Sequence, residues 1–157
     1  TLKALADEYQ LPIIVSTHPR TKKRLEALGE SFDHPLIRFE KPFGLFDYIK
    51  LQMGAFCILS DSGTITEEAS LLNLPAITIR NVHERPEGMD EGTLIMSGLE
   101  VGRVLESVKI VTSQHDSEKR VFPIVKDYQA GPVSSQVLRI VISYTDYINR
   151  TVWHKDN

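Results

Sequence analysis

The stretch that decides the fold of this chain runs from residue 60 to residue 69 and reads Ser60-Asp61-Ser62-Gly63-Thr64-Ile65-Thr66-Glu67-Glu68-Ala69. An apolar run at 55–59 precedes it and indicates a buried strand. A helical pattern follows, with Ile65, Ala69 and Leu72 expected on one face. A polar turn therefore joins the C-terminal end of a strand to the start of a helix. In parallel α/β sheets, ligands bind at strand ends of this kind.

The turn at Ser62 and Gly63 has the properties of a phosphate site. A helix N-terminus offers free backbone N–H groups and a partial positive charge, and Gly63 lets the backbone approach a phosphate closely. Glu68, one turn into the helix, can accept hydrogen bonds from sugar hydroxyls. Taken alone, the decapeptide fits a second interpretation equally well. Ser62 is then only an N-cap, and Glu67 and Glu68 complement the helix macrodipole.

The composition is that of a single globular domain. The 157 residues are 41% apolar and 25% charged, and the net charge of −3 gives no electrostatic reason to expect nucleic acid or an anionic membrane as a partner. No apolar run approaches the ~20 residues that span a bilayer, and no signal-peptide pattern opens the chain. The single cysteine, Cys57, lies in an apolar run, which predicts a core residue in a reducing compartment. We therefore expect a cytoplasmic protein.

Short apolar runs alternate with helical patterns along the chain. Strands are predicted at 12–17, 35–39, 56–60, 75–79 and 93–97, and helices at 21–28 (closed by Gly29), 44–53, 64–73, 101–113 and 133–148. The strand runs are rich in Ile and Val and do not alternate, as expected for strands covered on both faces. We predict an α/β fold with a parallel sheet in three α/β/α layers. The segment 114–131 is expected to be irregular.

Two further strand ends carry polar side chains. His18 follows the first strand and is a candidate acid/base group or phosphate-side donor, although a loop histidine without a role is equally compatible. Residues 80–88 follow the strand at 75–79 and include Arg80 and Arg85, whose planar guanidinium groups suit a diphosphate. An isolated cluster of this kind is more often a salt-bridged surface turn. Because the three strand ends meet at one edge of the sheet, the residues predict an anion or nucleotide site there.

Aromatic residues gather at the start of the helix at 44–53. Phe43, Phe46 and Tyr48 offer rings that can stack on a base, although such residues more often belong to the core. No histidines, acids or cysteine have a metal-ligand spacing, and neither a GxGxxG fingerprint nor a Walker A loop is present. No metal or cofactor is predicted.

Several motifs together resemble the non-hydrolysing UDP-N-acetylglucosamine 2-epimerase family over about residues 11–148. They are the stretch at 60–69, Leu74-Pro75, Arg80, Glu84-Arg85-Pro86-Glu87 and Gly92-Thr93. The Asp-Ser-Gly…Glu-Glu and Glu-Arg-Pro-Glu motifs together are specific for the family, whereas either motif alone is a weak signal. Within the family, the chain most resembles the branch that acts on UDP-2-acetamido-2,6-dideoxy-L-talose. The residues that indicate this branch are Thr64 and Thr66 in the motif and the segment Tyr144-Thr145-Asp146-Tyr147 near the C-terminus. That branch makes UDP-N-acetyl-L-fucosamine for capsule or O-antigen.

The resemblance implies a fold and a reaction. Family members have two Rossmann-like domains in the GT-B arrangement, with the active site between them and a homodimer as the expected assembly. Residues 1–157 resemble the C-terminal, UDP-binding domain, and the opening at Thr1, within a helix-like pattern, leads us to expect a longer protein. The family eliminates UDP and adds it back on the other face of the sugar, without metal or redox cofactor. Its catalytic acids lie in the N-terminal domain, so this chain alone is expected to be inactive.

The resemblance also implies roles for individual residues. The turn at Ser62 and Gly63 binds the diphosphate of a UDP-N-acetyl sugar, Glu68 holds the ribose hydroxyls, and Arg85 contacts the UDP portion. Tyr48 stands where family members commonly carry the Phe that packs on uracil. Phe46, Asp61 and Arg80 are neighbouring candidates, and His18 is the one acid/base candidate in this chain.

Two other classes of function remain open at this stage. One is the C-terminal domain of a GT-B glycosyltransferase, against which the motif at 84–87 argues. The other is a non-catalytic nucleotide-sugar binding module.

Overall fold

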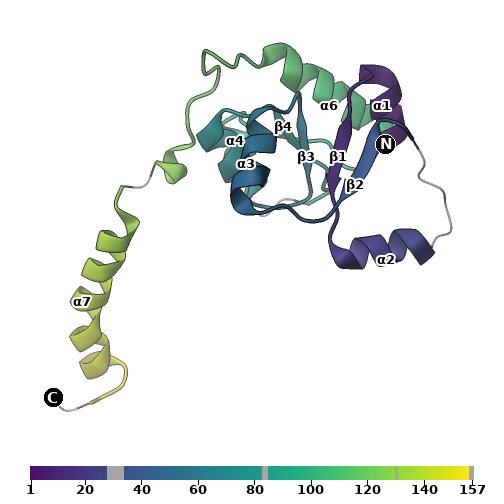
Figure 1. Cartoon of the computed structure of the whole chain (residues 1–157). Helices are drawn as coiled ribbons and strands as arrows, with labels where there is room; N and C mark the ends of the chain where they lie inside the picture. Colours follow the sequence, from purple (N-terminus) through teal and green to yellow (C-terminus); the bar gives the residue numbers. More distant parts are fainter. Residues whose placement is uncertain (28–33, 83–84, 130, 156–157) are drawn as a thin grey trace. The chain divides into compact units, whose positions relative to one another are not determined.

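The computed structural model of the chain describes residues 1–27, 34–82, 85–129 and 131–155. It divides into two compact units, Thr1–Val125 and Lys126–Asn157, each of which is described by itself (Figure 1).

The first unit contains two parallel sheets. Strands β1 (Ile13–Ser16) and β2 (Ile37–Glu40) pair in register Ile13 to Ile37, and the second sheet has the order β3-β4-β5, formed by Ile58–Ser60, Ala76–Thr78 and Ile95–Met96. The helices of this unit are α1 (Leu2–Tyr9), α2 (Pro19–Ala27), α3 (Leu45–Met53), α4 (Ile65–Leu72), α5 (Glu87–Asp90) and α6 (Val101–Gln114). In both sheets each strand runs in the same direction as its neighbour, which confirms the predicted parallel α/β fold.

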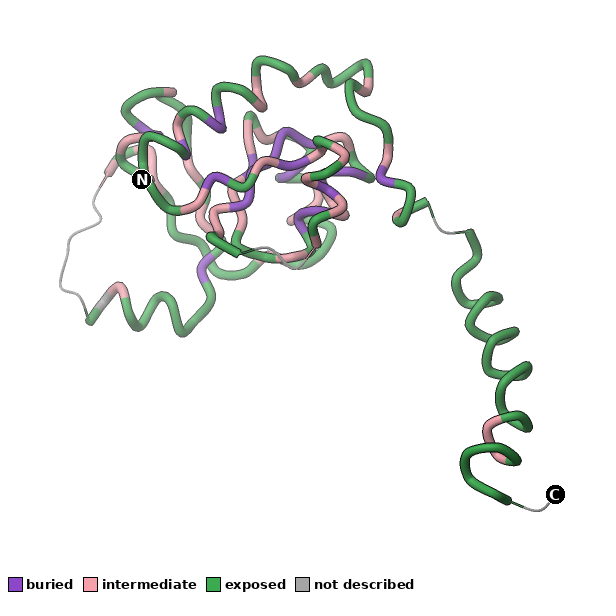
Figure 2. Tube along the Cα trace, turned by 180° about the vertical axis from the view of Figure 1, so that it is seen from behind, coloured by how far each residue is buried: buried purple, intermediate pink, exposed green. Residues whose placement is uncertain are grey.

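Both faces of the β3-β4-β5 sheet are covered. Ala76 and Ile77 are consecutive residues of β4 and both are fully buried, but they belong to different hydrophobic clusters. On one side lie residues of β3, α4 and the strand approaches: Ile58, Ile65, Ala69, Leu74, Ala76 and Leu94. On the other lie residues of α1, β4 and α6: Leu5, Ile77, Val104 and Val108. Burial therefore concentrates around the sheet (Figure 2), and a strand with both faces buried has no reason to alternate polar with apolar residues.

Only part of the apolar face predicted for α4 is buried. Ile65 and Ala69 lie in the core, but Leu72 is 37% exposed. The helix ends at Leu72 because Asn73 adopts a left-handed conformation (φ 54°) and its backbone N–H bonds to the carbonyl of Ala69. This turn redirects the chain, and Leu74 enters the core in place of Leu72.

Helices α2 and α5 also differ from the sequence-based expectation. The helix predicted at 21–28 begins at Pro19, a residue whose fixed φ suits a first helical position, and its predicted end at Gly29 lies outside the described residues. The four-residue helix α5 begins at Glu87, the last residue of the Glu-Arg-Pro-Glu motif, where no helix is predicted from the sequence.

The second unit contains a 3-10 turn (η1, Lys126–Tyr128) and the long helix α7 (Val133–Thr151). Apolar residues of α7 are largely exposed, among them Val137, Ile140, Val141 and Tyr144 at 52–57%. Tyr144 and Tyr147 contact each other edge to face, with ring centroids 6.3 Å apart. Within the described parts of the chain, no helix is both long and apolar enough to cross a bilayer.

Candidate functional site

A ladder of hydroxyl groups shapes the turn between β3 and α4. Ser60 Oγ accepts the Ser62 N–H at 3.1 Å, Ser62 Oγ accepts the Thr64 N–H at 3.4 Å, and the hydroxyls of Ser62 and Thr64 lie 3.0 Å apart. The helix begins at Ile65, so its N-cap is Thr64 and not Ser62. Thr64 makes no side-chain cap hydrogen bond, whereas Ser62 Oγ accepts the N–H two residues on, so the capping interpretation of Ser62 stays compatible with the structure.

The second feature of the site is a contact between this turn and Arg85. The Arg85 Nε lies 3.1 Å from Glu67 Oε1, and the two side chains are 38% and 31% exposed. The guanidinium also lies directly over Gly63, because a Cβ added there would overlap Arg85 Nη1 and stand 3.3 Å from Cζ. The segments after β3 and after β4 thus meet. Gly63 is required for a close approach, but in this structure the approaching group is a guanidinium.

The third feature joins α3 to α4. The amide nitrogen of Gln52 donates to Glu68 Oε2 at 2.5 Å, and Gln52 is only 3% exposed. Tyr48 lies one turn before Gln52 on α3, on the same helix face. Burial, followed by the negative charge of Glu68, raises the pKa of Tyr48, and a hydrogen bond with the Gln52 side chain opposes that rise. Tyr48, Gln52 and Glu68 therefore form one cluster, which we call the α3–α4 cluster.

Gln52 is a site residue that sequence reasoning missed. A glutamine inside an amphipathic helical pattern indicates a solvated position, and only its burial against Glu68 shows otherwise.

Buried polar atoms without partners also concentrate here. Among the described residues, three buried side-chain atoms lack a hydrogen-bond partner: Gln52 Oε1, Glu67 Oε2 and Thr78 Oγ1. An unsatisfied buried polar atom costs roughly 1–3 kcal/mol, and such exceptions in a folded protein need an explanation. Two of the three belong to α4 or to the helix that faces it, beside the turn at Gly63. This arrangement indicates a ligand site.

The remaining sequence candidates occupy exposed or partly buried positions. His18 is exposed, and its Nδ1 accepts the Arg20 N–H at 3.2 Å, so it caps α2. Its strand belongs to the two-stranded sheet, whereas Arg85 and Gly63 extend from the three-stranded one. Phe46 is 86% exposed, which excludes it from the core. Asp61 is exposed, Arg80 is partly buried, and the neighbours His83 and Glu84 lie outside the described residues.

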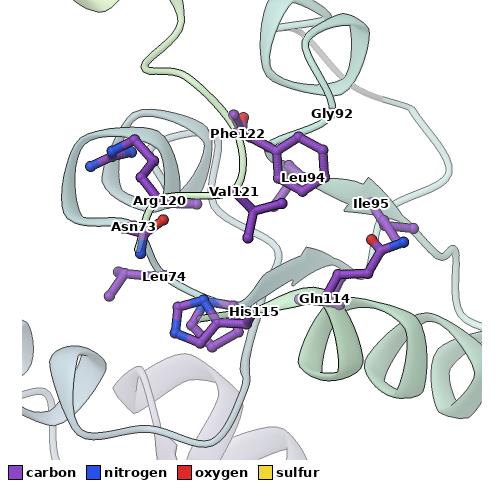
Figure 3. Close-up of a pocket in the computed structure, with 14 residues that line it drawn as sticks. Asn73, Leu74, Gly92, Leu94, Ile95, Gln114, His115, Arg120, Val121 and Phe122 are labelled. Atoms are coloured by element: carbon purple, nitrogen blue, oxygen red, sulfur yellow. The ribbon is translucent and has the colours of Figure 1, made fainter. Parts of the chain in front are cut away.

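A small cavity of about 60 Å³ lies elsewhere (Figure 3). It is lined by residues that precede strands, such as Pro75 before β4 and Leu94 before β5, together with the end of α6. These are the N-terminal ends of the strands, whereas the turn at Ser62 follows the C-terminal end of β3. The cavity is therefore separate from the candidate site. The described residues contain no group of three or more metal-ligating side chains.

The fold and the turn together define a class: an α/β domain with hydroxyl groups, a glycine and an arginine gathered after the strand ends. Residues 1–142 match the protein family described as UDP-N-acetylglucosamine 2-epimerase. The chain belongs to this family.

Individual relatives agree. The UDP-N-acetylglucosamine 2-epimerase of Methanocaldococcus jannaschii is 36% identical over 118 residues, which cover 73% of this chain and 32% of that protein. The enzyme of the same name from Bacillus subtilis is 23% identical over 147 residues, covering 93% of this chain and 39% of that protein. The chain spans about a third of the length of the curated relatives it matches.

Solved structures show the same architecture. The structure of UDP-N-acetylglucosamine 2-epimerase from Rickettsia bellii is 63% identical, with a TM-score of 0.89 over 98% of this chain and 42% of that one. The M. jannaschii enzyme in complex with UDP-GlcNAc and UDP is 30% identical, with a TM-score of 0.79 over 90% of this chain and 38% of that one.

Proposed function

We propose that this chain is the UDP-binding C-terminal domain of a UDP-N-acetyl-sugar 2-epimerase, an isomerase that inverts C2 of the sugar. The observation that carries the proposal is the contact of Arg85 with Gly63 and Glu67 at the β3–α4 turn, in a chain that belongs to the family. The structure of a relative in complex with UDP-GlcNAc and UDP gives the proposal its ligand class.

The diphosphate is proposed to bind at the turn. The Arg85 guanidinium already lies over Gly63, so an anion placed on the turn gains a charge-assisted donor without a large movement of this side chain. The Ser62 and Thr64 hydroxyls are 3.0 Å apart and supply further donors. Glu67 pairs with the same guanidinium, its Oε1 lying 3.1 Å from Arg85 Nε.

The uridine is proposed to bind at the α3–α4 cluster. Glu68 is an acceptor-only group, which suits the vicinal hydroxyls of a ribose. Tyr48 is partly buried on α3 and offers a ring to the uracil. Glu67 and Glu68 are consecutive residues of α4, so the two halves of the nucleotide would bind to adjacent positions of one helix.

In the proposed reaction, this domain binds UDP, which is the leaving group. The hydrogen at C2 of the sugar has no adjacent carbonyl, so direct deprotonation is difficult. Elimination of UDP and its re-addition on the other face avoids that step. Negative charge then develops on the diphosphate, where Arg85 and the turn would stabilise it. The acids that act on the sugar are proposed to lie in an N-terminal domain, and the assembly to be a cytoplasmic homodimer.

A finer proposal concerns the sugar. The motif with Thr64 and Thr66 favours a UDP-2-acetamido-2,6-dideoxy-L-talose epimerase, which would supply UDP-N-acetyl-L-fucosamine for capsule or O-antigen. The test is a comparison of turnover of that sugar nucleotide and of UDP-GlcNAc by the protein that contains this chain. Preference for UDP-GlcNAc would remove the finer proposal and leave the coarser one.

The coarse proposal is tested by titrating the purified chain with UDP. Arg85→Ala should weaken UDP binding by roughly 1.5–3 kcal/mol, the range for a hydrogen bond to a charged group. Arg103→Ala is the matched control, because Arg103 also pairs with a glutamate (Glu106) but lies on α6. Equal affinity of the wild type and the Arg85 variant would exclude Arg85 from the site.

A glycosyltransferase domain of the same architecture would also bind UDP, and a non-catalytic module would bind it without turnover. Transfer of the sugar to an acceptor by the protein that contains this chain would identify a glycosyltransferase. Incorporation of solvent deuterium at C2 would identify an epimerase and exclude a non-catalytic module.

A further inference from the structure

We propose that Gln52 is a positioning residue: it holds the Glu68 carboxylate in the orientation that binds the ribose of a uridine nucleotide and fixes it relative to the Tyr48 ring. This inference rests on the proposed function, and it names a determinant of nucleoside recognition on α3.

The direction of the hydrogen bond is settled by the chemistry of the two groups. A carboxylate only accepts hydrogen bonds, so the atom of Gln52 that lies 2.5 Å from Glu68 Oε2 is the amide nitrogen. That nitrogen carries two hydrogens, enough for Glu68 and for the Tyr48 oxygen. A carboxylate has about four lone-pair sites. One bond from Gln52 therefore orients Glu68 and leaves it with acceptor capacity for ribose hydroxyls.

The unsatisfied oxygen of Gln52 argues for a role beyond packing. Gln52 is 3% exposed and its Oε1 has no partner among the described residues. A Met or Leu at this place would fill similar space without burying an unpaired acceptor. The amide is thus retained at a cost in stability, and its contact is with the residue proposed to hold the ribose.

Gln52 also links the two residues proposed to contact the nucleoside, Tyr48 for the base and Glu68 for the ribose. Tyr48 and Gln52 are four residues apart on α3, so their side chains lie on one face of the helix. Glu68 approaches from the first turn of α4. Because Gln52 donates to Glu68 and shares a helix face with Tyr48, it connects the helix that carries the proposed base platform to the proposed ribose acceptor.

The test uses the full 157-residue chain and the ligands UDP, 2′-deoxy-UDP and inorganic pyrophosphate. Gln52→Met keeps the volume and removes the amide. We expect UDP to bind roughly tenfold more weakly, the preference for UDP over 2′-deoxy-UDP to fall toward one, and pyrophosphate affinity to be unchanged. Gln136→Met on the exposed face of α7 is the matched control and should alter none of the three.

A swapped pair separates positioning from mere packing. The double variant Gln52→Glu with Glu68→Gln keeps one carboxylate and one amide in contact but moves the charge to α3. It should fold with a thermal midpoint close to that of the wild type and still bind UDP as weakly as the Glu68→Gln variant. Wild-type UDP affinity in the swapped pair would overturn the proposal.

The outcomes distinguish this inference from the function on which it rests. A wild-type chain that does not bind UDP contradicts the proposed function and, with it, the role of Gln52. A wild-type chain that binds UDP while Gln52→Met retains both affinity and preference contradicts the role of Gln52 alone. Equal losses for UDP and pyrophosphate would show that Gln52 only supports the fold.

Discussion

Replacing Gly63 with alanine tests the most specific contact of the site. A Cβ at this position would overlap Arg85 Nη1 and come within 3.3 Å of its Cζ. Gly63 does not have a positive φ, so alanine fits the backbone and the clash is confined to the side chain. The flexible guanidinium, and not the turn, is the group that must move. The variant should therefore lose the Arg85 contact while the domain remains folded.

The expected size of the effect follows from the contact that is lost. If Arg85 makes one charge-assisted contact to the diphosphate, Gly63→Ala should weaken UDP binding by about 1.5–3 kcal/mol, or roughly 10–150-fold. Isothermal titration with UDP measures this directly, and urea unfolding checks the fold. Gly54→Ala is the matched control, because a Cβ there meets only the Lys50 and Leu51 carbonyls at 3.7 and 3.9 Å.

A double-mutant cycle shows whether the effect of Gly63→Ala is transmitted by Arg85. In an Arg85→Ala background the added methyl has nothing to displace, so Gly63→Ala should cost less than about 0.5 kcal/mol of further UDP affinity. Additive losses would mean that the methyl acts on the diphosphate or on the turn itself. Unchanged UDP affinity in the single variant would refute the reasoning altogether.

Three further outcomes are expected. Burial raises the pKa of Cys57 from 9.0 to about 12. Because the thiol of the unfolded chain loses its proton at lower pH than that of the folded chain, the free energy of unfolding falls as pH rises from 9 to 12. Between pH 8 and pH 10.5, urea unfolding should show the wild type losing about 2 kcal/mol more stability than Cys57→Ala. Glu68→Gln should lower the pKa of Tyr48, since it removes a like charge; NMR titration of the ring would reveal an unchanged value if the two groups do not interact. Arg120→Ala should destabilise the domain by roughly 1–3 kcal/mol, because its guanidinium donates at 2.5 Å to the Ser70 carbonyl near the end of α4; unfolding midpoints equal to wild type would contradict this.

The strand–turn–helix core could be predicted from sequence because local signals agreed with tertiary packing there. The apolar run before Ser60 fits a strand in a sheet covered on both faces, and the polar turn at 61–64 fits the end of such a strand. The missed helix α5 shows the opposite case. Its second residue is Gly88, a poor helix former, yet a side chain there would overlap Thr66 Cγ2 on α4. Packing against α4, and not propensity, decides that helix, and a single sequence does not reveal such a contact.

The candidate site also contains residues that could be predicted from the sequence and residues that could not. Ser62, Gly63 and Arg85 could be chosen from their positions after strand ends, and Glu68 from its place one turn into the next helix. Arg85 does meet Gly63 in the structure. The roles of these residues as UDP ligands stay predictions. His18 was a candidate on equal grounds of position, but its imidazole caps α2, because Pro19 starts that helix earlier than the apolar pattern indicates. A cap depends on where the neighbouring backbone turns, which residue type alone does not specify.

The two consecutive glutamates of α4 have a consequence for how this domain can change over evolutionary time. Glu67 faces Arg85 and the turn, while Glu68 faces Gln52 on α3. In the proposed binding mode, substitutions on α3 would therefore alter which nucleobase or pentose is accepted without altering the contacts that hold Arg85 over Gly63. A lineage with this binding mode would exchange one nucleotide carrier for another through a few changes on a single helix, and keep its proposed diphosphate contacts throughout.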